Sequence, residues 1–336
     1  MSLAEQFEWF ADWCVGTSSL YERIARGIAN DPEVLTLAEE IPPKRGTPNI
    51  LLAAVHWHLL DDGSHPLADY YPNLTDDPKT DDPFPAFRDF CVEYESELLP
   101  LLRNRRTQTN AVRRCTALFP AFSHISNEVG NEPLAFVELG PSAGLNLCWD
   151  EYTYEYGDVG TFGTGECVLD AEVRSEKIPP VSVDFPPVAS RIGIDLNPLD
   201  VRDEADVRWL RALIWPEHGD RQRLLQRAAN VARQHPPDLR QGDAIEDLPA
   251  VLMGIPDDVP VCVFDTQMRY QLPDPAQDRL RARIEAAAQE RTLHWLSGHE
   301  ATDEWDNAFT LDWFDGEEYR SLAAYEQHGK WLRWLL

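Results

Sequence analysis

Leu134-Ala-Phe-Val-Glu-Leu139 runs directly into Gly140-Pro-Ser-Ala-Gly144, and this stretch decides the fold. Its first half is a short apolar run typical of a buried strand, and its second half has the small residues of a tight turn. Glycine is needed where φ is positive or where a ligand approaches the backbone. A helix that begins after such a turn presents free N–H groups. The stretch therefore predicts a strand, a turn and a helix with a candidate binding site at the turn, although a plain strand-to-helix turn has the same pattern.

Three further apolar runs follow, and helical patterns separate them. Strands that alternate with helices predict a parallel sheet with crossover connections. The runs are at 192–196, 259–264 and 292–296, and the helical patterns are at 203–214, 221–234 and 275–289. In the tail we expect strands at 309–314 and 331–336, with a partly helical 319–328 between them. The predicted fold class is α/β, with a mostly parallel sheet of about seven strands in which 134–139 is central.

Residues 1–130 differ in character, because their apolar residues recur close to the 3.6-residue period of a helix. We expect an all-helical N-terminal region at 1–130, which is a candidate cover for an acceptor site, and a second domain at 131–336. Residues 150–190 read as an insertion in that second domain. Tyrosines alternate with other residues at its start and the turn-rich 157–165 follows, which predicts an inserted β-hairpin.

Polar residues stand where the later strands of this sheet are expected to end. Ligands of open α/β sheets bind outside the carboxyl ends of the strands. Asp195 could accept both hydroxyls of a ribose there, or it could cap the next helix. Asp243 could accept the exocyclic amine of an adenine, with Ala244 leaving room for the ring. Asp265 adds a third polar group. Together with the turn at Gly140, these make four strand ends in this order, which are more specific than any one of them.

This order of motifs resembles that of Rossmann-like (class I) S-adenosylmethionine-dependent methyltransferases. The motifs are E-x-G-x-S-x-G from Glu138, G-I-D-L-N-P around Asp195, G-D-A around Asp243 and V-F-D-T around Asp265, and the resemblance covers about 130–336. It implies a Rossmann-like sheet and S-adenosylmethionine as the cofactor. It also implies that Asp195 holds the ribose and that Asp243 with Ala244 holds the adenine.

The same resemblance implies residues for the methionine end of the cofactor. Glu138 and the turn made by Gly140, Ser142 and Gly144 would hold the methionine part, and Asp265 would lie near it or near the axis of methyl transfer. The sequence departs from the pattern in two ways. Ser142 stands where the middle glycine is usual. Asp195 follows Gly140 by 55 positions, against roughly 20 in a compact nucleotide-binding unit.

The whole chain is also similar to an uncharacterised prokaryotic family that is catalogued as a domain of unknown function. This narrower resemblance rests on the stretches at 49–56, 65–72, 195–200 and 207–217. It implies the fold and supplies no activity. The segment at Asp265 lacks the Asp/Asn-Pro-Pro-aromatic motif of amino-directed DNA methyltransferases, so methylation of nucleobase amines is not supported.

These motifs favour a methyltransferase that acts on an unidentified small molecule. A non-catalytic protein that binds S-adenosylmethionine or a nucleotide is the alternative, since a fold does not determine a function. An NAD(P)-dependent oxidoreductase is disfavoured, because the turn at Gly140 lacks a full G-x-G-x-x-G. The candidate catalytic residues are His56, His65 and Asp265. For His56 a packed helix, and for His65 a packed aromatic loop, are the alternative readings.

The composition limits the partners. Asp and Glu number 58 against 30 Lys and Arg, a formal net charge of −28, which argues against nucleic acid. Such a charge is typical of a halophilic protein, and an ordinary acidic cytosolic protein is the alternative. The six cysteines form no C-x-x-C pair, and we expect no metal site. No apolar run approaches the roughly 18 residues of a membrane span, and no signal sequence is recognisable. We therefore expect a cytoplasmic protein with no membrane partner; the oligomeric state stays open.

Overall fold

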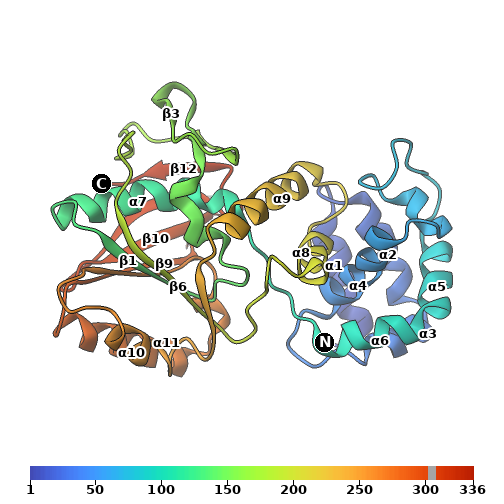
Figure 1. Cartoon of the computed structure of the whole chain (residues 1–336). Helices are drawn as coiled ribbons and strands as arrows, with labels where there is room; N and C mark the ends of the chain where they lie inside the picture. The colour runs from blue at the N-terminus through green and yellow to red at the C-terminus, as the bar shows by residue number, and fades with distance from the viewer. Residues whose placement is uncertain (302–307) are drawn as a thin grey trace. The chain divides into compact units, whose positions relative to one another are not determined.

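The computed structural model of the chain describes residues 1–301 and 308–336. The described chain divides into two compact units, each made of two segments (Figure 1). The helical unit comprises Met1–Thr109 and Asp203–Leu225, and the sheet unit comprises Asn110–Arg202 and Gln226–Leu336. All described strands belong to the sheet unit. The prediction of an α/β protein is confirmed, and no strand precedes residue 134 in the described chain.

Local capping signals begin the helices of the helical unit. The Ser2 hydroxyl accepts a hydrogen bond from the Glu5 amide at 3.2 Å, and the Glu5 carboxylate accepts one from the Ser2 amide at 2.6 Å. The indole of Trp57 in α4 donates to the Ala205 carbonyl of α8 at 3.1 Å. The helices are α1 (Leu3–Cys14), α2 (Ser19–Ala29), α3 (Pro32–Ala38), α4 (Thr47–Asp61), α5 (Phe84–Glu93), α6 (Glu95–Asn104) and α8 (Glu204–Ala212), with the short η1 (Pro66–Tyr70).

Five parallel strands form the centre of the sheet unit, in the order β7-β6-β1-β8-β9. Counted along the chain, this order is 3-2-1-4-5, so it reverses between β1 and β8, which is where ligands of such sheets bind. All six residues of β1 are buried. The strands are β1 (Leu134–Leu139), β6 (Val188–Asp195), β7 (Asp238–Gln241), β8 (Val261–Asp265) and β9 (Leu293–Glu300).

The sheet extends beyond β9 to nine strands, rather than the seven expected. β10 (Ala308–Phe314), β11 (Tyr319–Glu326) and β12 (Trp331–Trp334) form an antiparallel meander. The expectation of partial helix at 319–328 is wrong, because β11 pairs with β10 on one side and β12 on the other. The two-residue β5 (Glu172–Val173) completes the sheet by pairing parallel to β12.

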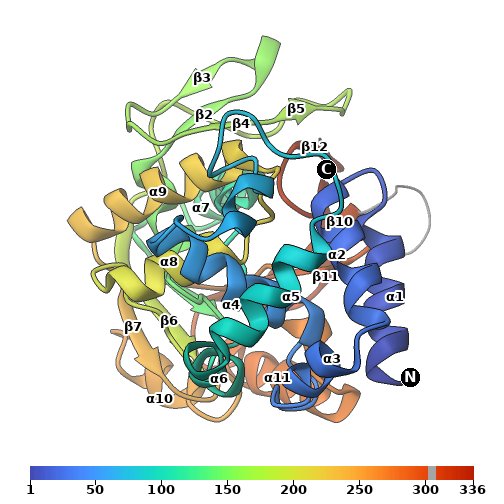
Figure 2. The same ribbon diagram turned by 90° about the vertical axis from the view of Figure 1, so that its right-hand side faces the viewer.

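The insertion forms a separate small sheet. β2 (Thr153–Glu155) and β3 (Thr161–Phe162) pair antiparallel, which is the predicted hairpin, and β4 (Val168–Asp170) returns parallel to β2. Figure 2 shows these three strands together, and their pairing makes them a sheet of their own. The three tyrosines of the strand pattern are buried, and each hydroxyl donates to a backbone carbonyl. The hairpin is therefore packed onto its unit by its tyrosines: Tyr152, Tyr154 and Tyr156.

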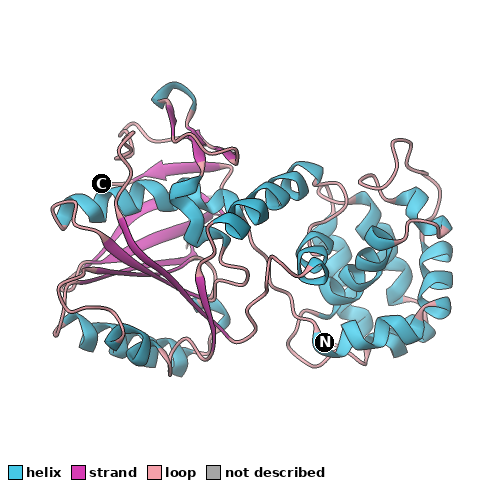
Figure 3. Ribbon diagram, viewed as in Figure 1, coloured by secondary structure: helices cyan, strands magenta, loops and turns pink. Residues whose placement is uncertain are grey.

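Helices cover both faces of the main sheet (Figure 3). On one face the Phe122 ring of α7 packs against Phe136 of β1 at 4.7 Å between ring centroids. On the other face α10 and α11 contribute to one apolar cluster with the strands. The elements are α7 (Cys115–Glu128), α10 (Leu248–Met253), α11 (Asp274–Ala288), η2 (Val112–Arg114), η3 (Leu145–Glu151), η4 (Gly157–Val159) and η5 (Arg269–Gln271), while α9 (Gly219–Gln234) contains the boundary of the two units. None of the described helices combines the length and the apolar character needed to cross a membrane.

Candidate functional site

The turn after β1 has a left-handed backbone at three positions. Gly140 has φ +71°, Ser142 has φ +54° and Gly144 has φ +70°. A side chain at Gly140 would also approach the Met268 Cγ atom to 2.9 Å, so backbone geometry and packing together require glycine there. Ser142 carries a Cβ in this conformation, which costs about 1–2 kcal/mol. A strained residue of this kind needs surrounding structure to hold it.

Asp195 at the end of β6 supplies that support. Its carboxylate accepts a hydrogen bond from the Ser142 amide at 2.8 Å and another from the Asn197 amide at 2.8 Å. The Leu199 amide in turn donates to the Ser142 carbonyl at 3.0 Å. The half-buried Asp195 therefore fastens the turn after β1 to the turn after β6. The sequence predicts a ribose ligand or a helix cap at Asp195 and gives no sign of this positioning role.

Glu138 is the buried acid at the end of β1. Its Oε1 accepts from the Asn146 side-chain amide at 2.8 Å, whereas its Oε2 is buried and has no hydrogen-bond partner among the described residues. Burial raises the pKa of Glu138 to about 8, against the opposing effects of Asn146 and the positive charge of Arg114. The Ser142 hydroxyl is likewise buried without a partner in the described structure. Two polar atoms at the end of β1 are thus left without a partner.

Arg114 is a buried charged residue that the sequence analysis missed. It precedes α7, and its guanidinium donates to Thr266 Oγ1 at 3.2 Å, to the Gln267 side-chain oxygen and to the Gln327 carbonyl at 2.9 Å. No described carboxylate forms an ion pair with it, and burial lowers its pKa. The signal available in the sequence was a pair of arginines, Arg113 and Arg114, directly before an apolar helix.

Asp265 lies fully buried at the end of β8, beside β1. Its carboxylate accepts from the Trp295 indole at 3.2 Å and from the Arg269 amide at 3.4 Å. Burial raises the pKa of Asp265 to about 6, although the Arg269 charge and the hydrogen bonds oppose the rise. Asp265 can therefore gain or lose a proton near neutral pH, which is the property of a general base.

The Gly242-Asp243-Ala244 segment follows β7, the edge strand. Asp243 is exposed, and its Oδ1 accepts from the Ile245 amide at 2.8 Å and the Glu246 amide at 3.2 Å. Ala244 packs against the apolar core cluster. Asp243 therefore stabilises its own turn, and its charge remains at the carboxyl edge of the sheet.

His56 and His65 lie in the helical unit. The buried His56 donates from Nδ1 to the Ala212 carbonyl at 3.0 Å and accepts at Nε2 from the Asn73 side chain at 2.9 Å. Burial lowers the pKa of His56 to about 4, so the ring is neutral near pH 7. His65 caps η1 by accepting from the Leu67 amide at 3.1 Å. Each histidine thus has a structural hydrogen bond, whereas the other candidate residues belong to the sheet unit.

The described strand ends offer hydrogen-bonding groups rather than a metal site. In the described part of the chain, no group of three or more His, Cys, Asp or Glu side chains could hold a metal ion. Polar residues stand at the ends of β1, β6 and β8, and the turn after β1 has a backbone of positive φ. Such an arrangement can hold a polar organic ligand by hydrogen bonds from backbone and side chains.

Fold and site together define a class: an α/β protein with a doubly wound parallel core and polar residues at the point where the strand order reverses. A family model described as "Uncharacterized protein conserved in bacteria (DUF2332)" matches residues 4–334, and the chain belongs to this family. The narrower resemblance found in the sequence is thereby confirmed. No curated protein matches the chain.

Proposed function

We propose that this protein is an S-adenosylmethionine-dependent methyltransferase that acts on a small molecule. The observation that carries the proposal is the pair of unpartnered buried oxygens, Glu138 Oε2 and Ser142 Oγ, at the switch point of the parallel sheet. Buried polar atoms normally have a partner, and an orphaned pair where ligands bind such sheets suits a ligand with polar groups.

The residues at the strand ends fit the two ends of this cofactor. An ionised Glu138 can accept from an α-ammonium group, and the Ser142 hydroxyl can donate to a carboxylate or accept from the ammonium. Asp195 retains acceptor capacity beyond the two amides it already serves, since a carboxylate has about four lone-pair positions. The exposed Asp243 Oδ2 can accept from an exocyclic amine.

The chemistry asked of the protein is modest. When bound, the cofactor supplies an electrophilic methyl group on a sulfonium. The protein aligns the acceptor with that methyl group, and alignment alone accounts for a large part of the acceleration in such displacements. If the acceptor carries a proton at working pH, Asp265, with a pKa of about 6, is a candidate base at this edge. The net charge of −28 opposes a nucleic-acid acceptor, which is why we propose a small one.

Calorimetry of S-adenosylmethionine and S-adenosylhomocysteine binding, in molar KCl, tests the proposal. We expect Asp195→Asn and Asp243→Asn each to weaken binding by about 10- to 100-fold, because each loses a charge-assisted hydrogen bond to the ligand. Asparagine keeps one acceptor oxygen for the amides that each aspartate serves, so it perturbs the turns less than alanine would. Glu290→Gln, an exposed carboxylate after α11, is the matched control and should bind like the wild type.

Each outcome separates one reading from the others. Wild-type protein that binds neither compound at millimolar concentration overturns the proposal, and binding of NAD(P) in their place supports an oxidoreductase. Binding that both substitutions leave unchanged means that the strand-end residues are not the site. Binding without turnover on a panel of small acceptors supports the non-catalytic alternative. Thermal unfolding of each variant without ligand shows whether Asp195→Asn acts through the turn instead.

A further inference from the structure

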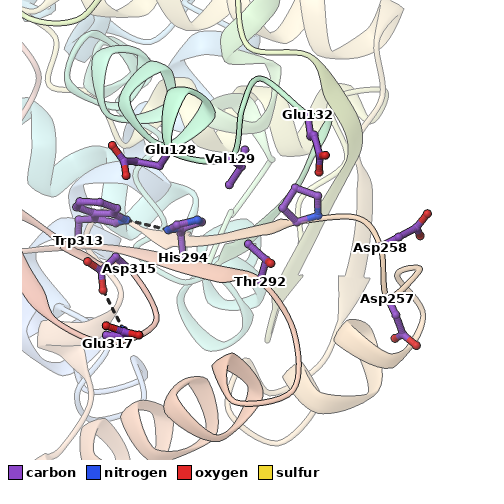
Figure 4. Close-up of a pocket in the computed structure, with 11 residues that line it drawn as sticks. Glu128, Val129, Glu132, Asp257, Asp258, Thr292, His294, Trp313, Asp315 and Glu317 are labelled. Carbon is purple, nitrogen blue, oxygen red and sulfur yellow. Dashed lines mark hydrogen bonds between the residues drawn. The ribbon is translucent and has the colours of Figure 1, made fainter.

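A pocket of about 500 Å³ opens at the edge of the sheet where β8 and β9 begin, opposite the edge discussed above (Figure 4). Its lining comes from the end of α7, the loop before β8, the start of β9 and the end of β10. His294, Trp313 and Pro260 are its buried members. We call it the acidic pocket, since six of its lining residues are carboxylates: Glu128, Glu132, Asp257, Asp258, Asp315 and Glu317.

The carboxylates of the acidic pocket are mostly without a positive partner. Asp315 pairs with Arg320 at 3.4 Å. The other five form no ion pair with any residue of the described chain. Like charges gathered around a concave surface attract cations from solution. An acidic cluster on a protein of this charge does not by itself indicate a ligand. A second, independent feature of the pocket is needed to indicate one.

That feature is His294, of which 5% is exposed. The Trp313 indole donates to His294 Nδ1 at 3.2 Å, and an indole N–H can only donate. The neutral ring must therefore carry its proton on Nε2. Burial lowers the pKa of His294 to about 4, which keeps the ring in this neutral form. Nε2 is buried without a partner among the described residues, and in Figure 4 it points away from Trp313 toward the middle of the lining residues.

In this tautomer His294 is unsuited to bind a metal, and its Nε2–H can donate a hydrogen bond to an acceptor on a ligand. A histidine that binds a metal through one nitrogen normally donates a hydrogen bond from the other, whereas His294 accepts there. A free N–H donor beside carboxylates instead matches a molecule that carries both positive charge and an acceptor oxygen. Plain alkylammonium groups would satisfy the carboxylates and leave the His294 N–H unpaired.

We propose that the acidic pocket binds a hydroxylated organic polycation, such as an amino alcohol or an amino sugar. Its ammonium groups pair with the carboxylates of Glu128, Glu132, Asp257 and Asp258, and a hydroxyl oxygen accepts from His294 Nε2. The site lies at the opposite edge of the sheet from Glu138 and Asp195, so it is independent of the proposed methyltransferase activity.

Two ligands that differ by one hydroxyl test the inference: 1,3-diamino-2-propanol and 1,3-diaminopropane. In calorimetry we expect the hydroxylated compound to bind about 3- to 10-fold more tightly, the value of one hydrogen bond. In His294→Asn the difference should vanish, since the asparagine oxygen can still accept from Trp313 while the Nε2–H is lost. Glu132→Gln with Asp258→Asn should weaken both compounds, whereas Asp278→Asn, an exposed carboxylate on α11, should weaken neither.

Equal affinity of the two compounds for the wild type would overturn the inference, and this comparison needs no variant to fold. A difference that survives in His294→Asn would also overturn it. If Asp278→Asn weakens binding as much as the pocket variants, or Mg²⁺ competes as well as the diamines, the pocket is only part of a general acidic surface. None of these results bears on S-adenosylmethionine binding, which is measured separately.

Discussion

The carboxylates at the two edges of the parallel sheet differ in burial and in hydrogen bonding. At the carboxyl edge, Glu138 and Asp265 are buried, and Asp195 is tied to the turns beside it by backbone amides. At the opposite edge, the acidic pocket holds carboxylates such as Asp257 and Asp258 that are exposed and largely unpaired. Burial and hydrogen bonds govern the first set, and salt screening governs the second. Substitutions at the two edges should therefore differ in size and in their dependence on salt.

Salt should have the largest effect, and it should act through exposed carboxylates. We expect the melting temperature of the wild type to rise by many degrees from dilute buffer to molar KCl, because salt screens the repulsion of a chain with net charge −28. Differential scanning calorimetry across this range measures it. A melting temperature that stays flat or falls would remove the basis for calling the protein halophilic.

Arg114→Met should cause the largest loss among single substitutions. It removes three hydrogen bonds from a buried guanidinium. Thr266 Oγ1 and the Gln267 side-chain oxygen lose their donor, and the Gln327 carbonyl keeps the bond from the Gln267 side-chain amide. We expect a loss of about 3–5 kcal/mol in the free energy of unfolding. Asp258→Asn at the opposite edge should change it by less than about 0.5 kcal/mol. Urea unfolding in molar KCl measures the free energy of unfolding of both variants. Equal losses in the two variants would contradict the difference that we infer between the edges.

Glu138→Gln should stabilise the protein, and more so as the pH rises. The folded pKa of about 8 lies above the usual value of 4.5, so folded Glu138 holds a proton that the unfolded chain has released. Its contribution to stability therefore falls between about pH 4.5 and pH 8. Glutamine does not titrate, so the variant should gain roughly 1–3 kcal/mol over the wild type between pH 5 and pH 8. A gain that does not change with pH would mean that Glu138 is ionised throughout.

Among the substitutions at the carboxyl edge, Asp195→Asn should have the smallest effect on stability. One of the two amide hydrogen bonds from Ser142 and Asn197 loses its acceptor oxygen, while the other is kept. We expect a loss of about 1 kcal/mol, little affected by salt because the bonds are local. Urea unfolding at low and high salt checks both points. A loss that disappears in molar KCl would place Asp195 with the exposed carboxylates instead.

The central strand and its turn could be predicted because their signals are local. An apolar run followed by Gly140 and Gly144 leaves few alternatives to a buried strand and a left-handed turn. The segment of β11 could not be assigned this way. Its Leu-Ala-Ala sequence suits a helix. Pairing with β10 on one side and with β12 on the other holds it extended.

In the candidate site, too, the features that depend on local sequence could be predicted and those that depend on distant residues could not. The end of β1 and the end of β8 were expected to carry acids, and both Glu138 and Asp265 lie there on neighbouring strands. The bond from Ser142 to Asp195 joins residues 53 positions apart, and no local pattern encodes it. Arg114 contacts residues more than 150 positions away, which is why it went unnoticed.

The two outermost strands of the nine-stranded sheet are short, and short edge strands limit self-association. At one edge β5 has two residues, and at the other β7 has four, with Asp238 and Arg240 paired along it. Salt that screens the charges within a chain of net charge −28 also screens the repulsion between copies of it. Brief, charged edge strands offer a neighbouring molecule few backbone groups to pair with whatever the ionic strength. Resistance to aggregation in brine would then come from strand length rather than from charge.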